Sequence, residues 1–139
     1  MKLVTWFSAL VFFASAANAE LVESKLTLPG KLGSAVLYSD SSKTEADPAV
    51  IVVHEWWGLN DYARGRAQQL AEAGYTAIAV DMYGNGKSTE HPKDAMAFMN
   101  AALAEPAKMN ARFDAALAIL RKQPAVDASK LYAIGYCFG

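Results

Sequence analysis

The sequence predicts an α/β fold in which a parallel sheet is covered by helices on both faces. Continuous apolar, β-branched runs alternate with longer segments whose apolar residues recur at helical spacing. Runs of the first kind are typical of strands that are buried on both faces. After an opening strand the predicted order is β-α-β-α-α-β, which favours parallel strands joined by helical crossovers.

The composition indicates one globular domain. Hydrophobic residues make up 53% and charged residues 19% of the 139 residues, which excludes disordered, collagen-like and coiled-coil classes. After residue 19 the chain carries 12 Lys and Arg against 14 Asp and Glu, and this near-neutral balance argues against nucleic acid as the main partner. The single cysteine cannot form an intramolecular disulfide, so a disulfide-stapled scaffold is excluded.

Residues 1–19 have the pattern of a secretory signal peptide. Lys2 gives a short basic start, an apolar stretch follows, and Ala17-Asn18-Ala19 forms a small-x-small cleavage site before Glu20. The apolar stretch is shorter than the about 20 residues that span a bilayer. We therefore expect cleavage after Ala19, export to the periplasm or the medium, and no stable membrane anchor. A retained anchor is the alternative.

The first half of the remaining chain predicts two strands and a helix. A strand is expected over 33–38, a polar loop over 39–48, and a buried strand over 49–53, where the run Ala-Val-Ile-Val-Val is continuous and apolar. A helix is expected over 61–73, with Asn60 or Asp61 as its cap and Gly74 as its stop. Its inward face is expected to consist of Tyr62, Ala63, Ala67, Leu70 and Ala71.

The second half predicts a strand, two helices and a final strand. A strand is expected over 75–80, and a glycine-rich loop follows over 81–88. Pro92 and Pro106 open helices that extend to Leu103 and to about Lys122, because proline is tolerated in the first helical turn. The last strand is expected over 130–134. The buried stripe of the second helix is expected to be Met109, Phe113, Ala116, Leu117 and Leu120.

The pentapeptide Gly135-Tyr136-Cys137-Phe138-Gly139 follows the last predicted strand directly. The pattern G-x-nucleophile-x-G is typical of a nucleophile elbow, a sharp strand-to-helix turn that presents a reactive side chain. Cysteine suits the central position because its thiolate attacks carbonyl carbons readily. The strand context favours this interpretation over a buried cysteine between two ordinary loop glycines.

A second candidate segment, His54-Glu55-Trp56-Trp57-Gly58, lies between the buried strand and the first helix. In hydrolases with such an elbow, this loop supplies one backbone N–H of the oxyanion hole and the residue after the nucleophile supplies the other. We therefore expect Trp56 and Phe138 to be the two donors. For Trp57, packing of the loop and a wall of the substrate pocket are equally compatible with the sequence.

Three segments, at 50–61, 79–84 and 135–139, together resemble the dienelactone hydrolase family of α/β-hydrolases. The resemblance spans about Leu26 to Gly139. It implies an α/β-hydrolase fold and a Cys-His-Asp triad that cleaves an ester or lactone through an acyl-enzyme, with no metal or organic cofactor. It also implies Cys137 as the nucleophile, Glu55 as the carboxylate that contacts and helps activate the thiol, and Tyr83 as a substrate-pocket residue. A surface ion pair is the alternative for Glu55.

The sequence departs from the family pattern in two respects. The triad His and Asp lie well beyond the elbow in this family, and such domains run to about 200–250 residues. Residues 20–139 are therefore interpreted as the N-terminal portion of the domain, truncated after the elbow and catalytically silent alone; the alternative is a non-catalytic fragment that acts as a binding module. No Arg lies between Arg66 and Arg112, which disfavours dienelactone itself as the substrate.

Other motifs fail on their spacing. His54-Glu55 does not begin a zinc-protease motif, because position 58 is Gly where a second His is needed. Gly86-Lys87-Ser88 does not end a P-loop, because Asp81 occupies the place of the leading glycine. His91 precedes a helix-opening proline, where a capping or exposed role is expected. His54 is disfavoured as a replacement for the missing triad histidine, because it lies at the end of a strand directly before Glu55.

Overall fold

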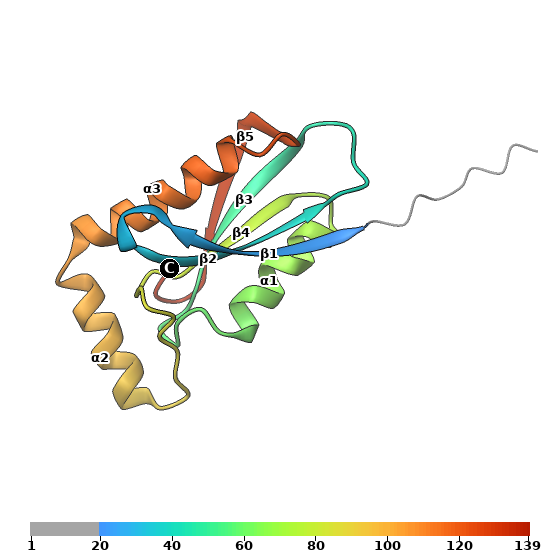
Figure 1. Cartoon of the computed structure of the whole chain (residues 1–139). Coiled ribbons are helices and arrows are strands. Elements are labelled where there is room, and N and C mark those ends of the chain that lie inside the picture. Colours follow the sequence, from blue (N-terminus) through green and yellow to red (C-terminus); the bar gives the residue numbers. More distant parts are fainter. Residues whose placement is uncertain (1–19) are drawn as a thin grey trace, which may run out of the picture.

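A computed structural model describes residues 20–139, and the predicted signal peptide lies outside them. A five-stranded sheet carries α1 on one face and α3 on the other (Figure 1). No helix within residues 20–139 is long and apolar enough to cross a membrane. In chain order the elements are β1 (Leu21–Leu28), a 3-10 turn η1 (Pro29–Lys31), β2 (Gly33–Asp40), β3 (Asp47–Val53), α1 (Asp61–Glu72), β4 (Thr76–Val80), α2 (Pro92–Leu103), α3 (Pro106–Arg121) and β5 (Val126–Gly135).

The predicted α/β class is confirmed, but the sheet is mixed rather than wholly parallel. The strand order is β1-β2-β4-β3-β5. The three strands β4, β3 and β5 are parallel, as predicted. Strand β2 is antiparallel to β4, and β1, which the sequence pattern does not predict, is antiparallel to β2. Because β1 is an edge strand in which polar residues interrupt the apolar ones and half of the residues are exposed, it lacks the apolar run that is typical of the buried strands.

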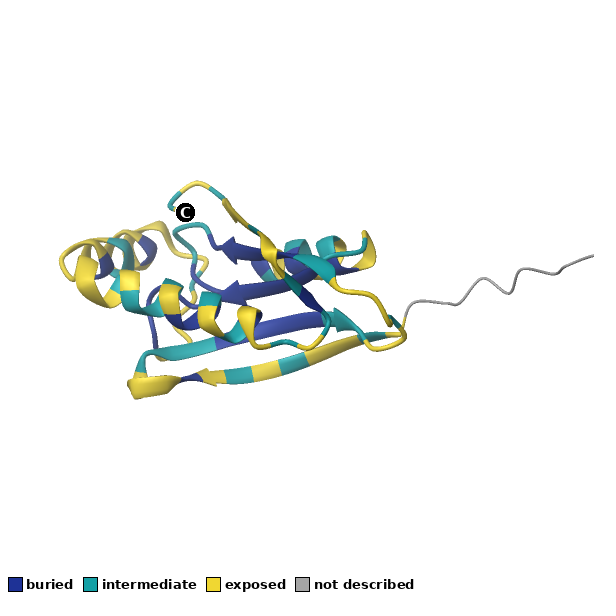
Figure 2. Cartoon of the chain, turned by 90° about the horizontal axis from the view of Figure 1, so that it is seen from above, coloured by how far each residue is buried: buried dark blue, intermediate teal, exposed yellow. Residues whose placement is uncertain are grey.

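Two apolar layers form the core, one on each face of the sheet. Successive strand residues point to opposite faces, so Ile51 packs in the layer under α3 whereas Val50 and Val52 pack in the layer under α1. Burial of each such side chain contributes roughly 1.5–3 kcal/mol. Figure 2 shows the buried residues concentrated in the central strands, with exposed residues along β1.

Helix α1 begins where the sequence predicts, but one residue of its expected inward face is outside the core. The Asn60 side chain accepts a hydrogen bond from the Ala63 N–H at 3.2 Å and so caps the helix. Ala63, Ala67 and Ala71 are buried, whereas Tyr62 is 50% exposed. Small residues spaced by four form a narrow contact face that lets the helix lie close to the sheet, and Tyr62 falls beside that face.

The strand register brings three sequence motifs to one edge of the sheet. Val53 of β3 pairs with Val80 of β4 on one side and with Gly135 of β5 on the other. The loops that leave the carboxyl ends of these parallel strands therefore start side by side, and ligand sites in α/β sheets form at such edges. These loops carry the Trp pair, the glycine-rich turn and the cysteine.

Candidate active site

Cys137 lies on a sharp turn directly after β5. Its φ is +54°, in the left-handed region that residues with a Cβ rarely adopt. The Tyr136 N–H donates to the Val53 carbonyl oxygen at 3.2 Å, and the Gly139 N–H donates to the Tyr136 carbonyl oxygen at 3.0 Å. The thiol is exposed. This is the backbone geometry expected of a nucleophile elbow.

The two glycines of the pentapeptide are required by close backbone contacts. A Cβ on Gly135 would lie 2.2 Å from the carbonyl carbon of Gly139. A Cβ on Gly139 would lie 2.7 Å from Cγ1 of Val53. Glycine at both positions therefore lets the turn fold back onto β3. For this reason, glycines two residues before and two residues after the cysteine are a sequence signal for the turn.

The Trp-containing loop is held by its own backbone and by the glycine-rich segment. The Gly58 N–H donates to the Glu55 carbonyl oxygen at 3.2 Å, and the Thr89 N–H donates to the Trp57 carbonyl oxygen at 3.1 Å. Gly58 also forms an isolated β-bridge with Ser88. The two Trp rings meet edge to face with their centroids 4.8 Å apart. The Trp-containing loop therefore has a defined conformation, which these contacts fix independently of helix α1.

Two backbone N–H groups at this edge make no hydrogen bond to protein. Within residues 20–139, neither the Trp56 N–H nor the Phe138 N–H donates to a protein acceptor. The Phe138 N–H follows Cys137 directly in the chain, and the Trp56 N–H belongs to the loop after the neighbouring strand β3. The sequence motifs point to the same two groups as the oxyanion donors, and that role stays a prediction.

His54 joins two of the loops and is fully buried. Its Nε2 accepts a hydrogen bond from the Met82 N–H at 3.1 Å, and its Nδ1 lies 2.5 Å from the Glu55 carbonyl oxygen. The second contact requires a proton on Nδ1, so the ring is the neutral Nδ1–H tautomer. Burial lowers the pKa of His54, and the hydrogen bond to Glu55 opposes that shift only in part. With both ring nitrogens engaged, His54 is a structural residue and cannot act as a base for Cys137.

Tyr83 and Phe138 form an aromatic cluster with this histidine. The Tyr83 hydroxyl donates to the Trp56 carbonyl oxygen at 2.8 Å. The Tyr83 ring lies 4.8 Å from the His54 ring and 5.5 Å from the Phe138 ring. Burial raises the pKa of Tyr83 to about 12, with smaller contributions from the charges of Cys137 and Asp81. Tyr83 is therefore neutral, and it fixes the carbonyl of the residue whose N–H is the expected oxyanion donor.

Asp81 and Arg112 shape the glycine-rich loop, a role that the sequence motifs predict for neither residue. The buried Asp81 carboxylate accepts from the N–H groups of Tyr83, Gly84 and Gly86 at 2.9–3.0 Å. Arg112 of α3 donates to the Leu32 and Met82 carbonyl oxygens at 2.8 and 2.7 Å. For Asp81, the sequence signal is an acidic residue between a buried strand and a glycine-rich turn. Nothing in the sequence indicates the role of Arg112, because both of its partners are backbone atoms at least 30 residues away.

Two predicted site residues lie in the Trp loop without a polar side-chain contact to the thiol. Among the described residues, no hydrogen bond or ion pair joins the Glu55 carboxylate to Cys137 or to any cation. The surface ion pair that was the alternative for Glu55 is therefore not formed either. Trp57 contacts Trp56 through its ring and Thr89 through its carbonyl oxygen.

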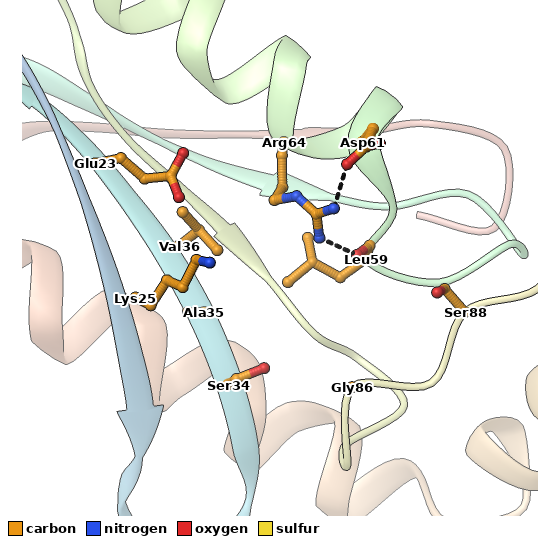
Figure 3. A pocket seen from close by; sticks show the side chains of 10 residues that line it. All are labelled: Glu23, Lys25, Ser34, Ala35, Val36, Leu59, Asp61, Arg64, Gly86 and Ser88. Carbon is orange, nitrogen blue, oxygen red and sulfur yellow. Dashed lines mark hydrogen bonds and ion pairs between the residues drawn. The ribbon is translucent and has the colours of Figure 1, made fainter.

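A cavity of about 530 Å³ lies apart from the elbow, beside the β1–β2 hairpin and the start of α1 (Figure 3). Arg64 reaches toward it and donates to the Leu59 carbonyl oxygen and to Asp61. Its lining contains none of the predicted site residues, and comprises Glu23, Lys25, Ser34, Ala35, Val36, Leu59, Asp61, Arg64, Gly86 and Ser88. Within residues 20–139 no group of three His, Cys, Asp or Glu side chains is placed to hold a metal ion.

The model of the dienelactone hydrolase family matches residues 34–139, from β2 through the elbow. The chain belongs to the dienelactone hydrolase family. Protein usf of Aquifex pyrophilus is 32% identical over 96 residues, which cover 66% of this chain and 41% of that protein. A protein of Aquifex aeolicus that carries the name carboxymethylenebutenolidase is 30% identical over 98 residues, which cover 68% of this chain and 42% of that protein.

Solved structures of this family have the same arrangement of elements. A dienelactone hydrolase-like promiscuous phosphotriesterase from metagenomic libraries superposes with a TM-score of 0.76 at 33% identity, over 88% of this chain and 51% of that structure. The chain therefore spans about half of the solved structure, and 41–42% of the two curated relatives named above. Residues 34–139, which the family model matches, contain the elbow and the Trp loop.

The buried His54 predicts a pH dependence of stability. Burial lowers the pKa of His54 in the folded state, whereas the unfolded chain binds a proton near the usual pKa of 6.5. The unfolded state thus binds more protons below that pH, and stability falls as the pH drops, by at most about 1.4 kcal/mol per pH unit from this one group. Urea unfolding between pH 7.5 and 5.5 measures the slope.

His54→Gln is expected to flatten this slope, whereas His91→Gln, which alters an exposed residue at the start of α2, should leave it unchanged. Equal slopes in the parent and in His54→Gln would contradict a neutral buried ring.

Proposed function

We propose that this chain supplies the nucleophile and the oxyanion site of a hydrolase that cleaves an ester or a lactone. The observation that carries the proposal is the left-handed Cys137 between two closely packed glycines, with unpaired Phe138 and Trp56 N–H groups on neighbouring loops. The relative from Aquifex aeolicus supports the substrate class, because its name contains the word butenolidase.

The reaction follows from the chemistry of the thiol. The Cys137 thiolate attacks the carbonyl carbon, and the electron pair of the C=O bond moves onto oxygen, where the Trp56 and Phe138 N–H groups donate to it. Collapse of this intermediate breaks the ester C–O bond and leaves a thioester, and the alcohol oxygen takes up the proton that the thiol gave up. The alcohol departs from an ester, whereas in a lactone it stays attached to the acyl group. Water then attacks the thioester and releases the acid and the thiol. Each such N–H donor contributes on the order of 3–4 kcal/mol to stabilisation of the intermediate.

The proton of the thiol must be taken by a group other than the two histidines of this sequence. His54 is buried with both nitrogens engaged, and His91 lies at the exposed start of α2. We propose that the triad His and Asp implied by the family lie outside the described residues. Residues 20–139 by themselves should therefore be silent in turnover: they form the thioester with an activated ester but hydrolyse it slowly, because loss of a general base typically removes about 10²- to 10⁴-fold in rate.

The test is rapid mixing of the protein with p-nitrophenyl acetate. We expect a burst of p-nitrophenol that approaches one equivalent per chain, followed by slow release. A lactone should be opened with the same requirement for a free thiol. Release that is no faster than from the chain unfolded in urea would contradict the proposal and favour a binding module without catalysis.

We propose that Glu55 promotes ionisation of the thiol as the substrate binds, in accordance with its place in the family motif. Glu55→Gln should slow the burst about 10-fold or more, as removal of a proton acceptor does, and leave unfolding by urea unchanged because its carboxylate makes no bond within residues 20–139. Glu45→Gln, on an exposed loop, is the matched control. A burst in Glu55→Gln that equals the parent's would exclude Glu55 from the chemistry.

We further propose that the protein is exported and that the mature chain begins at Glu20. The motivation is the small-x-small sequence Ala17-Asn18-Ala19 after the apolar run. Intact-mass measurement on material from the periplasm and the medium is expected to give a chain that starts at Glu20. A dominant species that retains residues 1–19 would contradict cleavage.

A further inference from the structure

We infer that Arg66 of α1 is a positioning residue for the Cys137 thiol and acts through Tyr136. The inference rests on the proposed function, because it concerns how the elbow is held. Tyr136 precedes Cys137 in the chain, so any restraint on Tyr136 is passed through one peptide bond to the thiol-bearing residue. The family match and the motif assign no role to Arg66.

The contacts between α1 and Tyr136 are specific. Arg66 Nε donates to the Tyr136 hydroxyl at 3.1 Å, and the guanidinium carbon lies 5.4 Å from the centroid of the Tyr136 ring. Tyr62 meets the same ring edge to face with its centroid 5.9 Å away. Tyr62 and Arg66 are four residues apart and share one face of the helix. Together they form a slot that receives the Tyr136 ring, which also accounts for the exposed position of Tyr62.

The backbone of Tyr136 is held at the same time. Its N–H bonds to Val53 and its carbonyl oxygen to Gly139, so both peptide groups that frame the turn are fixed. In the sheet formed by residues 20–139, β5 pairs with β3 alone. The slot on α1 therefore adds a restraint at the end of β5 besides the pairing with β3.

The strained conformation of Cys137 explains why such a restraint matters. A left-handed φ is unfavourable for a residue with a Cβ and persists only where the surroundings hold it. If the Tyr136 ring leaves its slot, the turn relaxes, and the Phe138 N–H no longer keeps a fixed direction relative to the thiol. We expect the thiolate to lose stabilisation and the pH midpoint of its reaction to rise.

Alkylation by iodoacetamide measures this directly, because Cys137 is the one cysteine of the sequence. In the 139-residue chain, Tyr136→Phe and Arg66→Met should each lower the alkylation rate at pH 7 by about 3- to 10-fold, the effect of losing one hydrogen bond, and move the pH profile upward. The double variant should be no slower than the slower single variant, since both changes remove the same contact. Tyr136→Phe keeps the ring and its packing.

Gln68→Ala is the matched control, because Gln68 bonds Glu72 at 2.9 Å on the exposed side of the same helix. It should leave the rate and the pH profile unchanged. Additive losses in the double variant, or single variants whose profiles match the parent's, would overturn the role of Arg66 while leaving the thiol proposal intact. A parent thiol that reacts no faster than in urea would contradict both.

Discussion

Replacement of Cys137 by Ala is expected to slow the first acyl transfer from p-nitrophenyl acetate by about 10³-fold or more, because it removes the atom that forms the thioester. The side chain is exposed and no core contact depends on it. Folding, measured by urea unfolding, should therefore stay close to that of the parent. Single-turnover release of p-nitrophenol with protein in excess gives the rate.

Cys137→Ser is the companion variant. It keeps a nucleophilic atom at the elbow, but a hydroxyl does not ionise near neutral pH without a base, and both histidines of the sequence are placed elsewhere. We expect it to be nearly as slow as Cys137→Ala. Acyl transfer at the parental rate in Cys137→Ala would show that the elbow is not the reacting site.

Gly58→Ala is expected to give the second-largest effect, through the Trp loop rather than the thiol. Gly58 has a φ of +90°, and a Cβ there would lie 2.1 Å from the Lys87 carbonyl oxygen. Relief of this clash must separate the loop from residues 87–89 and move the Trp56 N–H. We expect a loss of roughly 1–3 kcal/mol in the free energy of unfolding, together with a burst slowed by about 10²-fold, as for loss of one oxyanion donor.

Gly65→Ala provides the matched control on the neighbouring helix. Its Cβ would meet nothing within 4 Å, and alanine is favoured over glycine inside a helix by up to about 1 kcal/mol. This variant should be more stable than the parent and should show an unchanged burst. If Gly58→Ala instead matched the parent in both measurements, the Trp loop would have no part in the site.

The elements that the sequence predicted share one property: the residues that determine each of them are close together in the chain. The apolar run of β3, the prolines that open α2 and α3, and the cap at Asn60 each act locally, so their signals lie within a few residues. The elbow was predictable for the same reason, since its two glycines satisfy contacts within the pentapeptide and with the strand beside it.

The features that the sequence did not reveal depend on partners distant in the chain. His54 is fixed by Met82, and Arg112 by the carbonyl of Leu32, contacts that exist only once the strand register is set. The slot for Tyr136 joins residues 70 positions apart. Strand β1 was not predicted because an edge strand does not need a continuous run of apolar residues.

The central claim is that Cys137 forms a thioester at the elbow, and the most direct measurement is the mass of the protein quenched during the p-nitrophenol burst. We predict one acetyl group per chain, mapped to the peptide that contains Cys137, removed by neutral hydroxylamine and absent from Cys137→Ala. Release of p-nitrophenol with no adduct on that peptide, or with acetyl groups on lysines alone, would contradict the account.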